Sequence, residues 1–412
     1  MNVYLGIDWS QMKHDLCWMN EAGAVVAQQT ILHSADGFAK LDDARQRLEI
    51  APEACLVGIE TAHSLLIDFL WARGYTQVYV LAPGMINSIR GRFRQSGAKN
   101  DASDARLIAD VLRTDRARLM AWHPDGLLVQ QMRAKVGLIV YLKHNIVRWT
   151  NRLRAVLLRY YPAATEVFGA LTAQIALHFV QEFPTPQAAA ALAWEDFVAF
   201  AHRHHYTNMQ RLPDHFARLQ RTRPMPNPAA SAAYQEEGVH LAHLSLEWVQ
   251  TEHHEQSALA ALFELHLDAA LFRSLPGLGA FLAPAILTKF GEDRKRFPSA
   301  SKLQALAGTC PVTKSSGRHH AVHFRAAYDH DFRWMAQQWA VASVISVKSP
   351  WAVAYWHAVR ERGHSDSHTY RCVANRWLAV AWKVWQSRQP YDETTHFKHN
   401  LERSKPQRVT QN

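Results

Sequence analysis

The sequence predicts an α/β domain at the amino-terminal end of the chain, then long helices, then a mainly helical carboxyl-terminal domain. Three observations predict this fold class. Apolar, β-rich runs alternate with a helix-length stretch as far as residue 83, which is typical of a partly parallel sheet. Two long stretches farther along carry apolar residues at heptad spacing, as coiled-coil helices do. The remainder, as far as Tyr391, has a helical pattern and many tryptophans.

The α/β domain is expected to contain four strands and one helix. The strands are predicted over 3–8, 24–32, 56–60 and 78–81, and the helix over 64–73. Ala82-Pro83-Gly84 ends this pattern. The polar, basic stretch that follows begins as a loop and becomes helical from Ala102 onward, where apolar residues recur at helical spacing.

Two long amphipathic helices are predicted in the middle of the chain. The first runs from Leu127 to Tyr160, and the second runs from Val239 to about Leu271. Their seams consist of Val136, Ile139, Lys143, Ile146, Thr150, Leu153 and Leu157 in the first helix, and of Leu241, Leu244, Trp248, Ala258, Leu262 and Leu265, interrupted by Thr251 and Glu255, in the second. Such seams fit a coiled-coil hairpin or a dimer contact, and they fit two helices of one bundle equally well.

The segment between the long helices reads as an insert, near 166–231, to which the sequence assigns no role. Its last part, Arg223–Ser231, is expected to be a loop because it contains three prolines. His202, His204 and His205 could suggest a metal site, but no cysteine or acidic residue lies at ligand spacing. We therefore expect a solvated helix face there.

Composition and charge narrow the class of protein. The 412 residues are 48% hydrophobic and 20% charged, as in a globular protein with a sizeable core. No apolar run reaches membrane-spanning length and no signal peptide is recognisable. The four cysteines form no CxxC pair, so we expect reduced thiols and a cytoplasmic protein. The net charge of +10 attracts polyanions, nucleic acid first.

Four carboxylates form the first candidate site. Asp8 and Glu60 each follow a β-rich run, in the similar contexts "LGID" and "VGIE". If these strands are neighbours, both side chains emerge at one edge of the sheet. Asp101 and Asp104 are three residues apart, which puts them one turn apart on one face of a helix. Each acid alone also has a structural explanation: a polar strand end, a helix cap or a first-turn acid.

A set of four carboxylates is suited to phosphodiester cleavage. Two divalent ions about 3.5–4 Å apart can activate a nucleophile and stabilise the leaving oxygen, and oxygen ligands select Mg²⁺, or Mn²⁺, over zinc. Basic residues surround the acids and could bind phosphates, although a solvated face explains them equally well. They are Arg90, Arg92, Arg94, Lys99, Arg106, Arg113, Arg116 and Arg118.

Two further motifs lie in the carboxyl-terminal domain. Gly277 and Gly279 in "LPGLG" predict a helix-hairpin-helix turn, in which backbone N–H groups approach a phosphate; a plain turn between helices is the alternative. Farther on, "TKSSGRHH" predicts a loop that follows a helix from Ser299 to Gly308. Ser316 lies there before a glycine and the basic Arg318. An exposed serine in a basic loop can attack phosphate, although most Ser-Gly pairs are simple turns.

These motifs together resemble the DEDD insertion-sequence transposases of family one-ten, the bridge-RNA-guided recombinases. The similarity rests on "YLGIDWS", "VGIE", "KNDASDARLIADVL", "LPGLGAFLAPAIL", "RFPSASKLQALAGTCPVTKSSG" and "WQSRQPYD", in this order, over roughly residues 3–391. Two features depart from the family. A basic Gly-Asn stretch after the serine loop is replaced by "FRAAYDHDFRWMAQQWA", and the middle of the chain is longer.

The resemblance implies a fold and a domain order. A RuvC-like domain with the ribonuclease-H fold would occupy 1–120, with Asp8, Glu60, Asp101 and Asp104 as its Mg²⁺ ligands. A coiled-coil dimerisation region would follow over 121–268, including the insert near 166–231. The transposase domain with the serine loop would occupy 269–391, and 392–412 would be a polar tail.

The resemblance also implies a mechanism and partners. Ser316 would attack a DNA phosphate and form a phosphoserine intermediate, with Ser315 as a one-residue ambiguity. Arg90, Arg92, Arg94, Lys99, Gly277, Gly279 and Arg318 would contact nucleic acid. A structured noncoding guide RNA would pair with donor and target DNA. The protein would act on DNA in the bacterial cytoplasm as a homodimer, and as a tetramer in the active complex, with composite sites shared between subunits.

Other functions fit parts of the sequence. A RuvC-like junction nuclease would use the four acids without Ser316. A non-catalytic nucleic-acid-binding protein would need only the basic balance and the hairpin turn. An actin-like kinase also begins with a strand ending in Asp, but Trp9-Ser10-Gln11 lacks the glycine of that phosphate-binding turn.

Overall fold

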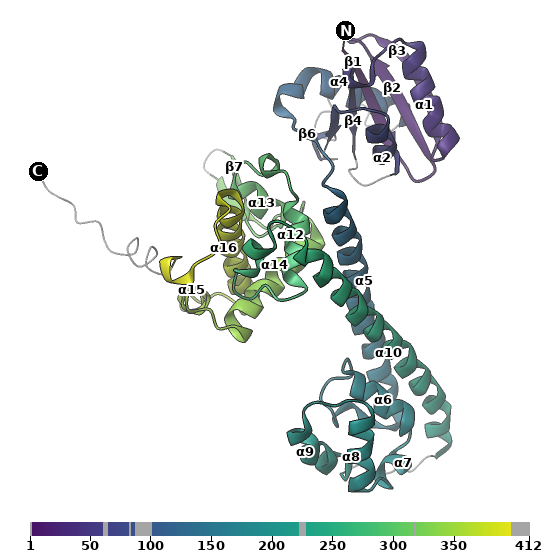
Figure 1. Cartoon of the computed structure of the whole chain (residues 1–412), viewed down its shortest axis with the longest axis vertical. Helices are drawn as coiled ribbons and strands as arrows, with labels where there is room; N and C mark the ends of the chain where they lie inside the picture. Colours follow the sequence, from purple (N-terminus) through teal and green to yellow (C-terminus); the bar gives the residue numbers. More distant parts are fainter. Residues whose placement is uncertain are drawn as a thin grey trace, which may run out of the picture. The chain divides into compact units, whose positions relative to one another are not determined.

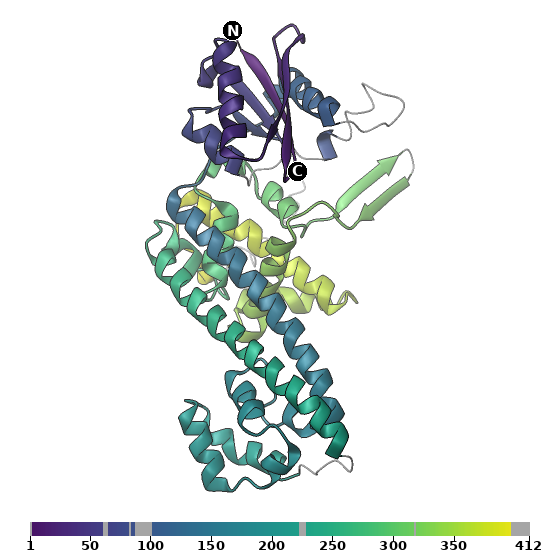
Figure 2. The same cartoon turned by 90° about the vertical axis from the view of Figure 1, so that its right-hand side faces the viewer.

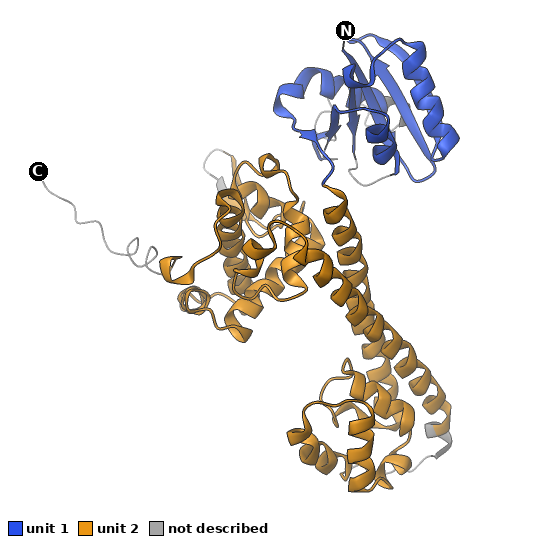
Figure 3. Ribbon diagram, in the orientation of Figure 1, with its two compact units in different colours: residues 1–125 blue, residues 126–412 orange. Residues whose placement is uncertain are grey.

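The computed structural model describes residues 2–60, 65–81, 84–86, 101–221, 228–316 and 319–396, with only the backbone described at 101–103, 228–231 and 319–320. The chain forms two compact units, Met1–Asp125 and Gly126–Asn412 (Figure 3). The finer division at residues 268 and 391 stays a prediction. The described helices include none with the length and apolar composition that a membrane crossing demands.

Unit 1 contains a six-stranded mixed sheet in the order β3-β2-β1-β4-β5-β6. β1, β4 and β5 run parallel, and β2, β3 and β6 are attached antiparallel to their neighbours. This is the mixed α/β arrangement expected for a RuvC-like domain. The strands are β1 (Val3–Trp9), β2 (Lys13–Met19), β3 (Val25–Leu32), β4 (Cys55–Ile59), β5 (Val78–Val80) and β6 (Ala121–Trp122).

Helices cover both faces of this sheet (Figure 1). One face packs against α1 (Ala35–Arg47) and α2 (Leu65–Ala72) through a core that includes Leu5 and Val57. The other face packs against α4 (Asp101–Asp115). Because successive side chains of a strand alternate between faces, the buried run of β1 contributes to both cores.

The four predicted strands and the helix over 64–73 are present, with ends shifted by a residue or two. The prediction missed β2, β6 and α1. β2 reads "KHDLCWM", and its charged and imidazole side chains hide the strand signal, although six of its seven residues are buried. Tertiary packing therefore decides this strand, and local sequence preference does not.

Unit 2 is built on two antiparallel helices, α5 (Leu127–Tyr160) and α10 (Pro228–Glu264). Three ion pairs show that the helices are antiparallel, because residues later in α5 pair with residues earlier in α10. The pairs are Lys135–Glu255 at 2.7 Å, Lys143–Glu252 at 2.6 Å and Arg152–Glu237 at 2.5 Å. The predicted seam of α5 is buried apart from Lys143, which is ion-paired. The two helices thus form a hairpin within one chain.

The predicted limits of the second long helix were wrong at both ends. α10 begins at Pro228, so Pro228–Ser231 are helical in backbone and do not belong to a loop. It ends at Glu264, and a separate short helix, α11 (Ala269–Arg273), follows. Proline at the first position of a helix lacks only an N–H that would be unpaired there, and so it starts α10 without cost.

Two hydrophobic cores form at opposite ends of the α5–α10 hairpin (Figure 1). The insert folds onto one end as α6 (Gln174–Glu182), α7 (Pro186–Ala190), α8 (Trp194–Arg203) and α9 (Leu212–Leu219). Onto the other end fold α11, α12 (Leu282–Phe290), α13 (Ala300–Leu306), α14 (His330–Val341), a π-helical turn (Ala342–Ser346), α15 (Pro350–Arg360) and α16 (Asp366–Ser387). The carboxyl-terminal domain is mainly helical, as predicted.

Candidate active site

Asp8 and Glu60 lie at the same level of the sheet. β1 and β4 are adjacent and parallel, and Ile7 is the register partner of Ile59. The next residue in each segment is an acid, Asp8 within β1 and Glu60 directly after β4, and both are partly exposed. The condition for a joint site, that the two strands are neighbours, is therefore met, although β1 continues to Trp9 and β4 ends at Ile59.

The same two acids belong to the face of the sheet that α4 covers. Tyr4, Gly6 and Asp8 alternate onto one face of β1, and Tyr4 packs with Ala109 of α4. A Cβ on Gly6 would lie 2.0 Å from the Ala105 carbonyl oxygen. Only glycine allows the α4 backbone to come this close to the strand.

Glu60 follows the same pattern on β4. Gly58 is the register partner of Gly6, and a Cβ on Gly58 would lie 2.8 Å from the Ile108 side chain of α4. Leu56, two residues before Gly58, packs in the same small core as Ala109. Side chains of a strand point alternately to the two faces of the sheet. If this alternation continues for one residue beyond β4, Glu60 lies on the same face as Leu56 and Gly58, the face that α4 covers.

The amino-terminal end of α4 lies over these acids. Tyr4 packs in one core with Ala109 and Leu112, whereas Gly6, two residues farther along β1, faces Ala105 and Ala109. Moving along β1 toward Asp8 therefore means moving along α4 toward its first turn. Asp104 lies in that turn and is only 4% exposed. A helix amino terminus also favours nearby negative charge.

Asp101 is the first residue of α4, but its side chain lies outside the described part of the structure. Among the described side chains, no three carboxylate, imidazole or thiol groups converge closely enough to hold a metal ion. Asp8, Glu60 and Asp104 each make further interactions. Carboxylate oxygens are the kind of ligand that Mg²⁺ or Mn²⁺ takes.

A fifth acid, Asp15, accompanies the predicted set. It is the register partner of Asp8 across the antiparallel β1–β2 pair, it is 9% exposed, and the Thr30 hydroxyl donates a hydrogen bond to it. Sequence reasoning missed Asp15 because it missed β2. The signal was an acid within a short apolar run that follows the first strand.

The buried histidine of unit 1 lies beside Asp15 on β2. His14 is fully buried, and its Nε2 lies 2.9 Å from Nδ1 of His33. Burial, with a smaller contribution from His33, lowers the pKa of His14 from 6.5 to about 4. The ring is therefore neutral at physiological pH and contributes no charge to the acids.

Ser315 and Ser316 end a strand instead of lying in a loop, which corrects the sequence prediction. β7 (Val312–Ser316) pairs antiparallel with β8 (His319–His323), and Ser316 is the register partner of His319. Both serines are exposed. Successive residues of a strand point to opposite faces, so only one of the two can face a given partner. The predicted contact residue Arg318 lies outside the described residues.

The two glycines of "LPGLG" differ in their surroundings. Gly277 has φ +86°, and a Cβ there would come within 2.7 Å of the Ser343 backbone nitrogen. Its conformation and its packing on the π-helical turn both require glycine. Gly279 is exposed, with no atom within 4 Å of a Cβ built there. Residues 274–281 connect α11 and α12, and both the predicted helix-hairpin-helix turn and its role toward phosphate stay predictions.

Part of the predicted basic run is neutralised within unit 1. Arg113 pairs with Asp110 at 2.6 Å, and Arg118 pairs with Asp115 at 3.4 Å. Arg90, Arg92, Arg94 and Lys99 lie outside the described residues. Their predicted contacts with nucleic acid therefore stay predictions.

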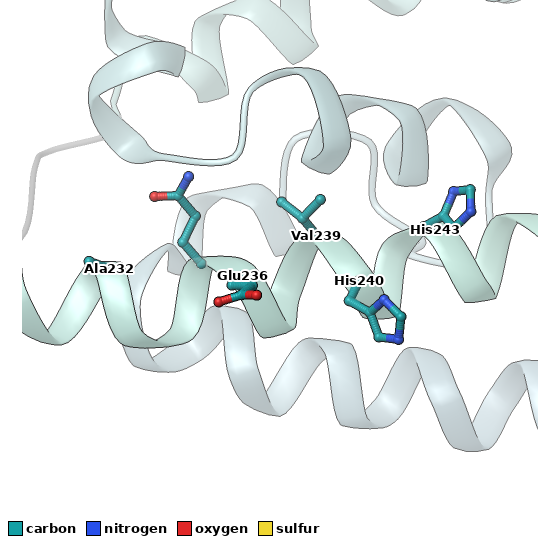
Figure 4. A pocket seen from close by; sticks show the side chains of 6 residues that line it. Ala232, Glu236, Val239, His240 and His243 are labelled. Carbon is teal, nitrogen blue, oxygen red and sulfur yellow. The ribbon is translucent and has the colours of Figure 1, made fainter.

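Two further features of unit 2, one on α10 and one in the insert, are remote in sequence from the acids. A hollow on α10 is lined by Ala232, Gln235, Glu236, Val239, His240 and His243 (Figure 4). In α8 and the turn after it, the histidines predicted to be only solvated include His204, which stacks on His178 at 3.9 Å and contacts Glu182. The tertiary fold thus supplies an acidic partner that spacing alone did not reveal.

The mixed α/β fold of unit 1 is consistent with a RuvC-like domain, the class of nuclease and transposase domain that acts on nucleic acids. Comparison with known proteins narrows this class. Residues 5–162 match the DEDD transposase model of the IS110 type, and residues 269–357 match the model for the transposase IS116/IS110/IS902 family.

Whole proteins of this kind resemble the chain over nearly all of its length. The "Mini-circle putative transposase for IS117" of Streptomyces coelicolor is 30% identical over 407 residues, which cover 96% of this chain and 97% of the relative. An IS110 protein of the same species is 24% identical over 95% of this chain and 97% of its own length. An IS116 protein of Streptomyces clavuligerus is 25% identical over 94% and 95%.

The chain belongs to the IS110 family of insertion-sequence transposases. It is accordingly a DNA transposase, and membership of the DEDD group implies a divalent metal cation.

Proposed function

We propose that this transposase cuts and rejoins the DNA strands of an insertion sequence with Mg²⁺ bound by Asp8, Glu60, Asp101 and Asp104. The observation that carries the proposal is the register of β1 and β4, which brings Asp8 of β1 and Glu60, the residue after β4, to one level on the face of the sheet that α4 covers. Bound Mg²⁺ would supply charge neutralisation at a phosphate. The chain's own part would be to orient two carboxylates on the sheet and two in the first turn of α4.

We further propose Ser316 as the nucleophile. Its Oγ would form a bond to a DNA phosphorus while one ester bond of that phosphate to deoxyribose breaks, and the released deoxyribose oxygen would take up a proton. Reversal of the step with another strand end would rejoin the DNA and free the serine. The exposed position of Ser316 at the end of β7 supports this role, since a DNA phosphate can reach it.

We propose that the partners are donor and target DNA and a structured noncoding guide RNA that pairs with both. The resemblance to bridge-RNA-guided recombinases and the net charge of +10 support this proposal. A homodimer, assembling into a tetramer, would combine the acids of one subunit with the serine of another.

The test is strand exchange between donor and target DNA with the RNA that copurifies with the protein. Asp8→Ala and Ser316→Ala should each abolish exchange, while Ser315→Ala retains it. A covalent protein–DNA adduct should form with wild type and Ser315→Ala, and be absent with Ser316→Ala. Exchange that survives Ser316→Ala would favour a RuvC-like nuclease without a serine step. Metal-independent binding without any cleavage would favour a purely nucleic-acid-binding protein.

A further inference from the structure

An arginine–aromatic cluster lies at the base of the β7–β8 hairpin. Phe324 directly follows β8, and the Arg333 guanidinium lies 3.9 Å from the centre of its ring. The Arg371 guanidinium lies 5.5 Å from the same ring centre. Arg333 also lies 4.6 Å from the ring centre of Tyr328. Two cations from different helices, α14 and α16, therefore share one aromatic side chain.

The positive charge of this cluster has no carboxylate to balance it within the described chain. Arg333 is 8% exposed, and its Nη1 is buried without a hydrogen-bond partner among the described atoms. The nearby Asp329 is already engaged, since it pairs with Lys289 at 2.7 Å and caps α14 through the Phe332 amide. Arg371 contacts His368, with Nη2 2.9 Å from the imidazole Nδ1. An imidazole carries no negative charge, so this contact does not neutralise the guanidinium.

Such an arrangement is costly unless an anion binds. Like charges near one ring repel, and a buried donor without a partner lowers the stability of the fold. Guanidinium groups present forked donors that match the oxygens of a phosphate. One phosphate bound beside Arg333 and Arg371 would neutralise both cations.

The cluster is rigidly connected to the start of the hairpin. A Cβ on Gly308 would lie 2.6 Å from Cγ of Tyr328, so this ring packs directly on the backbone just before β7. The Asp329 amide donates to the Leu306 carbonyl at 2.8 Å. Figure 2 shows the two strands extending away from the helices of unit 2. The cluster thus lies where the hairpin leaves the helical body.

We propose that Arg333 and Arg371 bind a phosphate of the DNA backbone at the base of the β7–β8 hairpin. The choice of DNA rests on the proposed function, because the same hairpin carries Ser316. From His319, the partner of Ser316, to Phe324 the chain advances five residues, or about 17 Å at roughly 3.4 Å per residue. This spans about five nucleotides of one strand at ~3.4 Å each. The site would bind the strand flanking the attacked phosphate.

The test measures binding, independently of catalysis. Anisotropy of a fluorescent duplex DNA is followed over a series of NaCl concentrations for the full chain. Arg371→Ala should weaken binding by about 3–10-fold and reduce the steepness of the log–log salt dependence by about 1. Arg333→Lys keeps the charge but loses the forked donors, so it should weaken binding with little change in the salt dependence.

Controls separate this proposal from general charge loss and from the proposed chemistry. Arg376→Ala removes one charge from the same helix outside the cluster and should bind nearly as wild type does. Ser316→Ala should bind DNA normally even where exchange is lost. If Arg371→Ala and Arg333→Lys, both folded by circular dichroism, bind DNA as Arg376→Ala does, the site does not exist. If they weaken binding only to an RNA of the same sequence, the assignment to DNA is wrong.

Discussion

Gly6 of β1 and Ala105 of α4 are in such close contact that a Cβ on the glycine would lie 2.0 Å from the Ala105 carbonyl oxygen. This contact sets the height of α4 above the sheet, and so the position of its first turn relative to Asp8. Gly6→Ala must push the helix and strand apart, because the obstructing atoms are backbone. We expect a loss of about 1–3 kcal/mol or more, measured as faster hydrogen exchange in β1 and α4.

Gly137→Ala is the matched control for Gly6→Ala. Gly137 lies within α5, and no atom lies within 4 Å of a Cβ built there. Alanine should stabilise that helix by roughly 0.5–1 kcal/mol. Equal hydrogen exchange in unit 1 for wild type and Gly6→Ala would show that α4 does not rest on this glycine.

The four-acid proposal predicts metal-dependent stabilisation of unit 1. Mg²⁺ should raise the melting temperature of the wild-type chain, since a ligand that binds only the folded state stabilises it. Asp8→Asn and Glu60→Gln keep the side-chain shape but lose the charge, and each should abolish this rise. The rise should persist in Ser316→Ala, which leaves the acids intact. A rise of equal size in both acid variants would place the metal elsewhere.

His14 should make unit 1 less stable as the pH falls. Burial lowers the pKa of His14 from 6.5 to about 4. Between these two pH values His14 binds a proton in the unfolded chain but not in the folded chain. The contribution of His14 to the free energy of unfolding is therefore complete above pH 6.5 and declines as the pH falls toward 4. The loss should reach at most ~3 kcal/mol.

His14→Gln tests this pH dependence because it removes the titrating group and retains a polar side chain. The difference in hydrogen exchange between wild type and the variant, compared at pH 7 and pH 4.5, should shift in favour of the variant at the lower pH. The same difference at both pH values would mean that His14 does not govern the acid response of unit 1.

The Lys143–Glu252 pair should stabilise the α5–α10 hairpin more than its exposed counterpart does. Glu252 is 5% exposed and lies 2.6 Å from Lys143. Lys143→Met leaves a buried carboxylate without its cation and should cost roughly 2–4 kcal/mol. Lys143→Met combined with Glu252→Met should recover most of that loss, because no charge is then left unpaired. Urea unfolding followed by circular dichroism measures both.

The pair Arg152–Glu237 is the matched control on the same two helices. Its side chains are 60% and 36% exposed, so Arg152→Ala should cost less than about 1 kcal/mol. If the two single variants lose equal stability, burial does not distinguish the two ion pairs.

The sequence by itself determined the elements with strong local patterns and the family of the protein. α5 has the limits that heptad spacing predicts, because a long apolar seam is readable without knowing its partner. The strands β1 and β4 were recognisable as apolar runs that lead into an acid, Asp8 or Glu60. Motif order then indicated a DEDD transposase, as the comparisons show.

The tertiary structure alone decided which of these elements meet. Nothing local to β1 or β4 fixes their parallel pairing, which depends on long-range hydrogen bonds and on two glycines that admit α4. Asp15 lies opposite Asp8 only because β2, whose polar residues hide it in the sequence, pairs with β1. Arg333 and Arg371 share Phe324 although they lie 38 residues apart. The contacts of a buried side chain are made largely with segments that are distant in the sequence. The spacing of residues along the chain indicates only which residues lie close together within one helix or strand.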